Sequence, residues 1–166
     1  MSYDRTRLRA RLIVSEALKL RVYRCTAGKL SIGVGRNLDD VGISAAETAA
    51  LGVTVASCKA VGIAKAQAMV LLDHDIDRAE ADLDRALPWW RTLDAVRQSV
   101  LVDMCFNMGL GNREKGLLSF VNTLALVQAH NFKGAASGML SSRWAKQVGD
   151  RAVHLAVMME TGKEPT

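Results

Sequence analysis

The sequence contains few residues of the kinds that interrupt helices or favour sheets. Among 166 residues there are two prolines, three Phe, two Tyr and three Trp. Ala, Leu, Val, Met and Arg are frequent instead, a composition typical of helices. We therefore expect a mainly α-helical protein, and a chain of this length fits one domain or two small lobes that share an element.

Cysteine is scarce, and its placement argues against two common stabilising devices. Cys25, Cys58 and Cys105 are an odd number of thiols and form neither a CxxC motif nor a Cys/His cluster. Neither a disulfide framework nor a structural zinc site is indicated. We expect reduced thiols, with Cys58 and Cys105 packed in the core, and no metal site.

Long apolar runs are absent as well. Arginines interrupt the apolar residues of the N-terminal segment, and no later segment approaches the roughly 20 apolar residues of a membrane span. We expect neither a signal peptide nor stable membrane insertion. The hydrophobic share of 49% and the charged share of 23% argue against a disordered or fibrous chain.

The net charge is positive, at +5, with a sequence pI of about 9.4. This balance favours anionic partners such as nucleic acid, phospholipid surfaces or bacterial cell-wall polymers. The charge alone does not choose among them.

Hydrophobic spacing divides the chain into a short mixed segment and a series of helices. A helix is expected over residues 3–19, and the alternation and glycines of residues 20–37 predict a hairpin or three-stranded sheet. Ser44 is the candidate N-cap of one short helix within residues 39–62. Residues 63–87 predict one helix about 37 Å long. Further helices are expected over residues 92–108, 119–129, 131–140 and 150–160.

These elements predict an α+β fold that is mainly α. We expect a single domain over residues 1–166, with a small α+β lobe at about residues 18–62 and a connecting helix at residues 63–87. Residues 88–166 and the N-terminal helix would form a helical lobe. A cleft between the lobes is the natural place for a ligand.

Three residues at offsets of nine and fifteen form the candidate catalytic set: Glu16, Cys25 and Ser31. The first helix would end in a carboxylic acid, the hairpin would begin with a thiol, and the facing strand would carry a hydroxyl. Such a set suits cleavage of a glycosidic bond. One acid protonates the leaving oxygen, a second group stabilises the transition state or activates water, and a hydroxyl orients that water.

This segment resembles the phage-type lysozymes, the endolysins of glycoside hydrolase family 24. Their pattern is a Glu, eight residues, an Asp or Cys, five residues and a Thr, followed by a strand reading I-G-x-G. Glu16, Cys25, Ser31 and Ile32-Gly33-Val34-Gly35 fill those places. The further matching segments are residues 92–97, 106–109, 120–122, 142–144, 151–152 and 161–162.

The resemblance implies a lysozyme-like fold with its active site in the cleft between the lobes. It also implies cleavage of the β-1,4 bond between N-acetylmuramic acid and N-acetylglucosamine in bacterial peptidoglycan, without a cofactor. Glu16 would be the general acid, Cys25 would replace the second acidic group, and Ser31 would hold the attacking water.

Supporting residues are implied in the same way. Arg151 in the last helix would pair with Glu16, and an ion pair between Arg36 and Asp75 would link the hairpin to the long helix. The other residues expected to support the site or bind substrate are Gly35, Asn107 and Asn122.

The sequence departs from the family pattern at several places. A free thiol has a pKa near 8.5, so Cys25 would need cationic neighbours such as Arg24 or Lys29 to ionise at neutral pH. A Cys25 thiolate could attack the anomeric carbon and give retention, or activate water and give inversion; otherwise catalysis depends more on Glu16. The remaining departures are Ser31 for Thr, Ala17 for Gly, Gly138 for Asn and Ala64 for a capping Thr.

The resemblance implies peptidoglycan as the partner of a monomer that binds no nucleic acid. It also implies storage in the host cytoplasm and release to the periplasm and cell wall through a holin-type pore. Two alternatives stay open on the sequence. One is a peptidoglycan-binding protein that has lost catalysis, and the other is a basic helical DNA-binding module.

Overall fold

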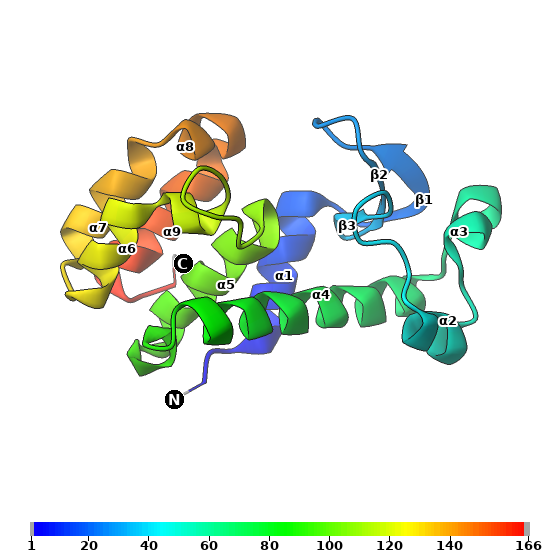
Figure 1. Ribbon diagram of the computed structural model, residues 1–166, viewed down its shortest axis with the longest axis horizontal. Helices are drawn as coiled ribbons and strands as arrows, with labels where there is room; N and C mark the ends of the chain where they lie inside the picture. The colour runs from blue at the N-terminus through cyan, green and yellow to red at the C-terminus, as the bar shows by residue number, and fades with distance from the viewer. Residues whose placement is uncertain (1, 165–166) are drawn as a thin grey trace. The chain divides into compact units, whose positions relative to one another are not determined.

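The computed structural model describes residues 2–164 (Figure 1). The chain forms two compact units. One consists of Arg9–Asp77 and the other of Met1–Leu8 with Arg78–Thr166. The boundaries fall inside the helices α1 (Arg5–Glu16) and α4 (Lys65–Ala86). The units are described separately.

The unit of residues 9–77 contains a three-stranded antiparallel sheet, as predicted. Its strands β1, β2 and β3 are neighbours in chain order. Tyr23 on β1 lies opposite Ser31 on β2, and Ile32 on β2 lies opposite Arg36 on β3. The strand bounds are Lys19–Arg24, Leu30–Gly33 and Arg36–Asn37.

Two short helices follow the sheet, where the sequence predicted one. Ser44 caps α2 (Ala45–Leu51) in a capping box with Glu47, as its candidate role required. The helix that was missed is α3 (Val55–Val61), which begins with a second capping box, between Thr54 and Ser57. The long helix α4 is confirmed.

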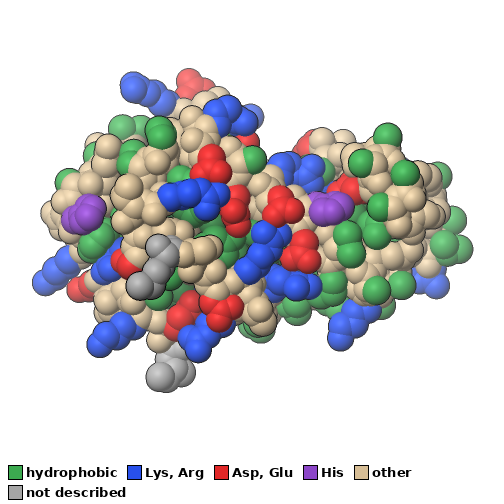
Figure 2. Space-filling model, turned by 90° about the horizontal axis from the view of Figure 1, so that it is seen from below, with side chains coloured by type: hydrophobic (Ala, Val, Ile, Leu, Met, Phe, Trp, Pro, Cys, Tyr) green, Lys and Arg blue, Asp and Glu red, His purple; other side chains and the backbone are tan. Residues whose placement is uncertain are grey.

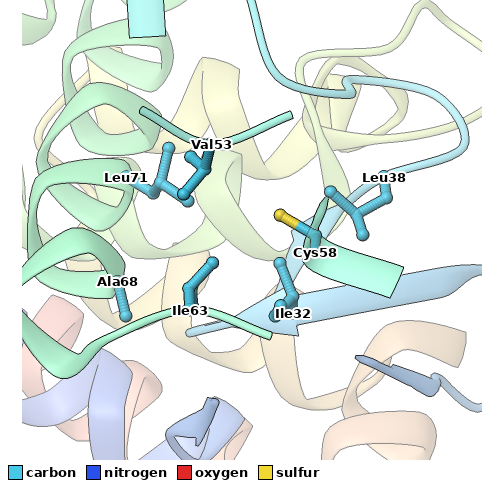
Figure 3. Packing of buried hydrophobic residues seen from close by; sticks show 7 residues of the cluster. All are labelled: Ile32, Leu38, Val53, Cys58, Ile63, Ala68 and Leu71. Atoms are coloured by element: carbon cyan, nitrogen blue, oxygen red, sulfur yellow. The ribbon is translucent and has the colours of Figure 1, made fainter. Parts of the chain in front are cut away.

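A small apolar core holds the sheet and these helices together (Figure 3). Side chains from β2, α3, α4 and the loops between them fill it, and burial of this kind supplies most of the free energy that stabilises a small unit. The Cys58 thiol is fully buried there, as expected, and burial raises its pKa. The buried members are Ile32, Leu38, Val53, Cys58, Ile63, Ala68 and Leu71.

Every secondary-structure element in the described residues of the other unit is a helix. The helices α6 and α9 both pack on α7, and α5 packs on α9. The predicted segments are present, but the sequence missed α8 (Arg143–Val148), whose six residues begin at the N-cap Ser142. The other elements are η1 (Trp90–Thr92), α5 (Ala95–Met108), η2 (Leu117–Ser119), α6 (Val121–Gln128), α7 (Phe132–Leu140) and α9 (Asp150–Thr161).

The surface carries charges of both signs. On the face seen in Figure 2, Lys and Arg side chains are intermingled with Asp and Glu rather than gathered in one basic patch. Among the described residues, no helix is both long and apolar enough to cross a membrane.

Candidate active site

Glu16 is the last residue of α1, where the chain turns toward β1. The next residue, Ala17, has a φ of 61°, a left-handed conformation that costs an L-residue with a Cβ roughly 1–2 kcal/mol. The left-handed residue ends the helix directly after Glu16. Glu16 therefore lies at the C-terminal end of α1, where the chain changes direction.

The Glu16 carboxyl lies against the turn between β2 and β3. An added Cβ at Gly35 would stand 3.3 Å from Glu16 Oε2, and Gly35 has a φ of 74°. The absence of a side chain thus allows the carboxyl to approach the turn, in a conformation that glycine adopts without strain. Two of the predicted site residues are brought together in this way.

Tyr23 on β1 lies between Glu16 and Cys25 in the chain and opposite Ser31 in the sheet. Burial raises the pKa of its phenol, the negative charges of Glu16 and Cys25 raise it further, and a hydrogen bond with the Ser31 side chain opposes the rise. Strand register places Tyr23 opposite Ser31, two residues before Cys25. The sequence had marked Tyr23 only as a match flanking the motif.

Cys25 is a free, half-buried thiol directly after β1. A tight turn follows it, because its N–H donates to the Lys29 carbonyl at 2.9 Å and its carbonyl accepts from Gly28 N–H at 2.8 Å. The two cations expected to favour a thiolate bond to other groups. Arg24 Nη1 donates to the Gly28 carbonyl at 2.8 Å, and Lys29 Nζ donates to Asp40 Oδ1 at 3.0 Å.

The ion pair between Arg36 and Asp75 is confirmed, with Arg36 Nε 2.9 Å from Asp75 Oδ2. The sequence missed its second carboxylate, Glu47, which accepts from both terminal nitrogens of Arg36 at 3.0 and 2.8 Å. Arg36 also donates to the carbonyls of Gly42 and Leu71. Because the Arg36 side chain is 1% exposed and that of Glu47 6% exposed, this is a buried charge network that joins β3 to α2 and α4.

Arg151 lies in the other unit, at the start of α9. Its Nε donates to Asp103 Oδ1 on α5 at 2.9 Å, and Asp103 is fully buried. The sequence did not single out Asp103, although one carboxylate inside an apolar helix was a signal of a buried partner. The expected pairing of Arg151 with Glu16 stays a prediction.

Asn107 and Asn122 belong to the same unit as Arg151. Asn107 Oδ1 accepts from Trp144 Nε1 at 2.8 Å, and Trp144 packs edge-to-face on Phe120 with ring centroids 6.0 Å apart. Trp144, Phe120 and Asn122 line a pocket of about 720 Å³. Its other lining residues are Met108, Glu114, Lys115, Gly116, Ser119, Val121, Thr123, Gly138, Ser142, Arg143 and Gln147.

Gly138 shapes this pocket. An added Cβ there would come within 2.5 Å of Thr123 Oγ1, so a side chain at position 138 requires the threonine to move. Glycine at position 138, where the family pattern has Asn, therefore leaves room for the Thr123 hydroxyl at the pocket wall.

Comparison with known proteins decides the family. Residues 14–157 match the phage lysozyme family. The chain belongs to this family. That stretch contains Glu16, Cys25, Ser31 and Arg151, so the phage lysozyme match covers the whole candidate set.

The chain is similar to three proteins with curated names. "Probable T4-type lysozyme 1" of Dictyostelium discoideum is 25% identical over 156 residues, covering 89% of each chain. "Probable T4-type lysozyme 2" of the same organism is 27% identical over 164 residues, covering 93% of this chain and 94% of the relative. The pre-baseplate central spike protein Gp5 of Enterobacteria phage T4 is 26% identical over 156 residues, which span 89% of this chain but 26% of the spike protein.

Ala17→Gly should stabilise this protein. Glycine adopts the φ of 61° without the steric cost that alanine meets. Relief of this strain should raise the free energy of unfolding. The greater conformational entropy of glycine in the unfolded chain opposes part of the gain, and we expect a net rise of about 1 kcal/mol. Thermal denaturation would then show a Tm higher by about 2–4 °C. A lower Tm would show that the left-handed turn carries no strain.

Proposed function

We propose that this protein is a muramidase that cleaves the β-1,4 bond between N-acetylmuramic acid and N-acetylglucosamine, with Glu16 as general acid. Membership of the phage lysozyme family supports peptidoglycan hydrolysis. The observation that supports the assignment to Glu16 is the position of its carboxyl against the turn at Gly35, in the unit that also contains Cys25 and Ser31.

The proposed reaction gives each of the three residues one role. The Glu16 carboxylic acid gives its proton to the glycosidic oxygen as the bond to the anomeric carbon breaks. Ser31 orients a water, and Cys25, as thiolate, accepts the proton that this water loses as it attacks the anomeric carbon. The configuration is then inverted. If the Cys25 sulfur attacks the anomeric carbon instead, a covalent intermediate forms, and water activated by the Glu16 carboxylate then displaces the sulfur, so that the configuration is retained.

Variants of Cys25 test whether an ionisable group is required there. We expect Cys25→Asp to keep activity at neutral pH, because a carboxyl with a pKa near 3.9 is ionised there. Cys25→Ser should lower kcat roughly 100-fold, because a hydroxyl neither ionises nor accepts a proton readily. Reducing-end assays on purified sacculi, with NMR of the product anomer, measure both quantities. Equal activity of Cys25→Ser and wild type would leave Glu16 as the only ionisable group that the reaction uses.

The pocket in the helical unit is proposed to bind the glycan or its attached peptide. Asn122 supplies an amide at the pocket wall, and Asn107 holds the Trp144 ring in place through the indole N–H. A pocket lined by both polar and apolar side chains suits a substrate that carries both kinds of surface. Asn122→Ala should therefore raise KM more than it lowers kcat.

The biological setting follows from the same proposal. A muramidase kept in the host cytoplasm as a monomer, which reaches the periplasm and cell wall through a separate holin-type pore, would cause lysis at the end of a phage cycle. The second candidate is a wall-binding protein without catalysis, which the replacement of the usual Asp by Cys25 favours. Purified protein that binds sacculi and releases no reducing ends would support the second candidate.

A further inference from the structure

We propose that the loop of residues 109–116, between α5 and η2, makes the pocket of the helical unit selective for peptidoglycan whose peptides carry diaminopimelate rather than lysine. This inference rests on the proposed function, because it names the part of peptidoglycan that the pocket takes. The side chain of diaminopimelate ends in an ammonium and a carboxylate on one carbon, whereas that of lysine ends in an ammonium alone. A selective pocket therefore has to provide a group for the extra carboxylate.

Hydrogen bonds within the loop give its backbone a defined shape. The Gly109 carbonyl accepts from Leu117 N–H at 2.9 Å and closes the base of the loop. Nearer the tip, the Lys115 carbonyl accepts from Asn112 N–H at 2.8 Å. The side-chain oxygen of Asn112 accepts in turn from the N–H groups of Glu114 and Lys115, at 2.9 and 3.2 Å. The tip is thus held in place before a ligand arrives, which lowers the entropy cost of binding.

The tip places neighbouring charges of opposite sign at the pocket. Glu114 and Lys115 both line it, and Arg143, the first residue of α8, adds a second cation. All three residues are exposed. Within residues 2–164, the side chains of these three residues form no ion pair and no hydrogen bond. Their charges are therefore available to a ligand without the loss of a contact inside the protein.

These charges match the groups of a diaminopimelate peptide. Glu114 suits the ammonium, and Lys115, next to it in the chain, suits the carboxylate on the same carbon. Arg143 suits the carboxylate of the preceding D-glutamate, which lysine peptides also carry. The rings of Trp144 and Phe120 give the methylene chain an apolar wall. With lysine in the peptide, Lys115 has no partner on the ligand and lies near an ammonium of like charge.

Binding of soluble peptides tests the selectivity without any cleavage. The probes are two peptides, L-Ala-γ-D-Glu-X-D-Ala with diaminopimelate or lysine as X, which differ only in the extra carboxylate. We expect the dissociation constant, measured by NMR titration, to be about 5-fold lower for the diaminopimelate peptide, the effect of an ion pair at a solvent-accessible site. Equal affinity for the two peptides, or binding of neither, would overturn the proposal.

Variants of the charged residues show which group reads the extra carboxylate. Lys115→Met should raise the dissociation constant of the diaminopimelate peptide about 5-fold and leave that of the lysine peptide within twofold. Glu114→Gln and Arg143→Met should weaken both peptides alike, because they contact groups that both peptides carry. Selectivity that survives in Lys115→Met would overturn the proposal. An equal loss of selectivity in Arg143→Met would overturn it too, since the pocket would then respond to positive charge in general.

Lys146→Met is the matched control. Lys146 is an exposed residue of α8 and is not part of the pocket lining, so its replacement removes the same charge from the same unit. Both dissociation constants should stay unchanged. A loss of selectivity in this variant would assign the effect to the overall charge of the protein and would contradict a role of the loop.

Digestion of two kinds of sacculi separates this inference from the proposed function. Wild type should release reducing ends faster from sacculi that contain diaminopimelate than from sacculi that contain lysine, and Lys115→Met should reduce the difference. Equal rates on both kinds would overturn the inference and leave the proposed function intact. A protein that binds the diaminopimelate peptide selectively and releases no reducing ends would contradict the proposed function and leave the selectivity of the pocket intact.

Discussion

Glu16→Gln is expected to lower kcat for peptidoglycan cleavage by about 10³-fold or more. The amide keeps the size and packing of the side chain against Gly35 but has no proton to give to the leaving oxygen, and general acid catalysis contributes about 10²–10⁴-fold. Release of reducing ends from purified sacculi measures the loss. Because the amide is nearly isosteric, the Tm should stay within about 2 °C of wild type.

Glu160→Gln is the matched control for this variant. Glu160 is an exposed carboxylate near the end of α9, in the other unit. The same change of charge there should leave kcat unaltered. A Glu16→Gln protein that keeps more than a tenth of the wild-type activity would remove Glu16 from the role of general acid.

Arg36→Met is expected to lower the free energy of unfolding by about 3–5 kcal/mol. The variant leaves the buried carboxylate of Glu47 and that of Asp75 without the guanidinium that both contact, and removing one partner of a buried ion pair has a cost of this size. Urea denaturation at pH 7 measures the change. The loss should shift the Tm downward by roughly 10 °C.

The same variant should change how stability depends on pH. Hydrogen bonds from Arg36 and the Ser44 N–H outweigh burial and hold the pKa of Glu47 well below its usual range. A carboxyl whose pKa is lower in the folded state stabilises the fold above its unfolded pKa, near 4.5, and this contribution is lost as the pH falls below that value. Wild type should therefore lose stability below about pH 4.5, and Arg36→Met should show a weaker loss there.

Arg85→Met is the control for Arg36→Met. The Arg85 side chain is 69% exposed and pairs with Asp82 on the same helix, so its removal should cost less than about 1 kcal/mol. Equal losses in the two variants would show that burial of the Arg36 network adds nothing to stability.

The elements predicted best from the sequence were those with long or dense local signals. Apolar residues at helical spacing over more than twenty residues predicted α4, and alternation with glycines predicted the sheet. The helices α3 and α8 were missed because each has seven residues or fewer, too few for a periodic pattern. Their capping residues Thr54 and Ser142 were the available signals.

Some residues of the candidate site were likewise predicted from the sequence, and others were missed. The motif spacing and the family resemblance pointed to Glu16, Cys25 and Ser31, and the ion pair between Arg36 and Asp75 is present. Glu47 was missed because a carboxylate in the first turn of a helix is ordinarily a solvent-exposed cap, and only the fold shows that it is buried. The pairing of Tyr23 with Ser31 depends on strand register, which residue spacing alone does not define.

The central claim is that the protein cleaves the glycosidic bond of peptidoglycan with Glu16 as general acid. Identifying the bond that is cleaved tests this claim most directly. Purified sacculi digested with the protein, followed by mass spectrometry of the soluble fragments, show which bond is broken. The account predicts fragments that end in reducing N-acetylmuramic acid, formed by wild type and not by Glu16→Gln. Sacculi that stay intact with the protein bound, or fragments that carry new peptide termini and unbroken glycan strands, would contradict it.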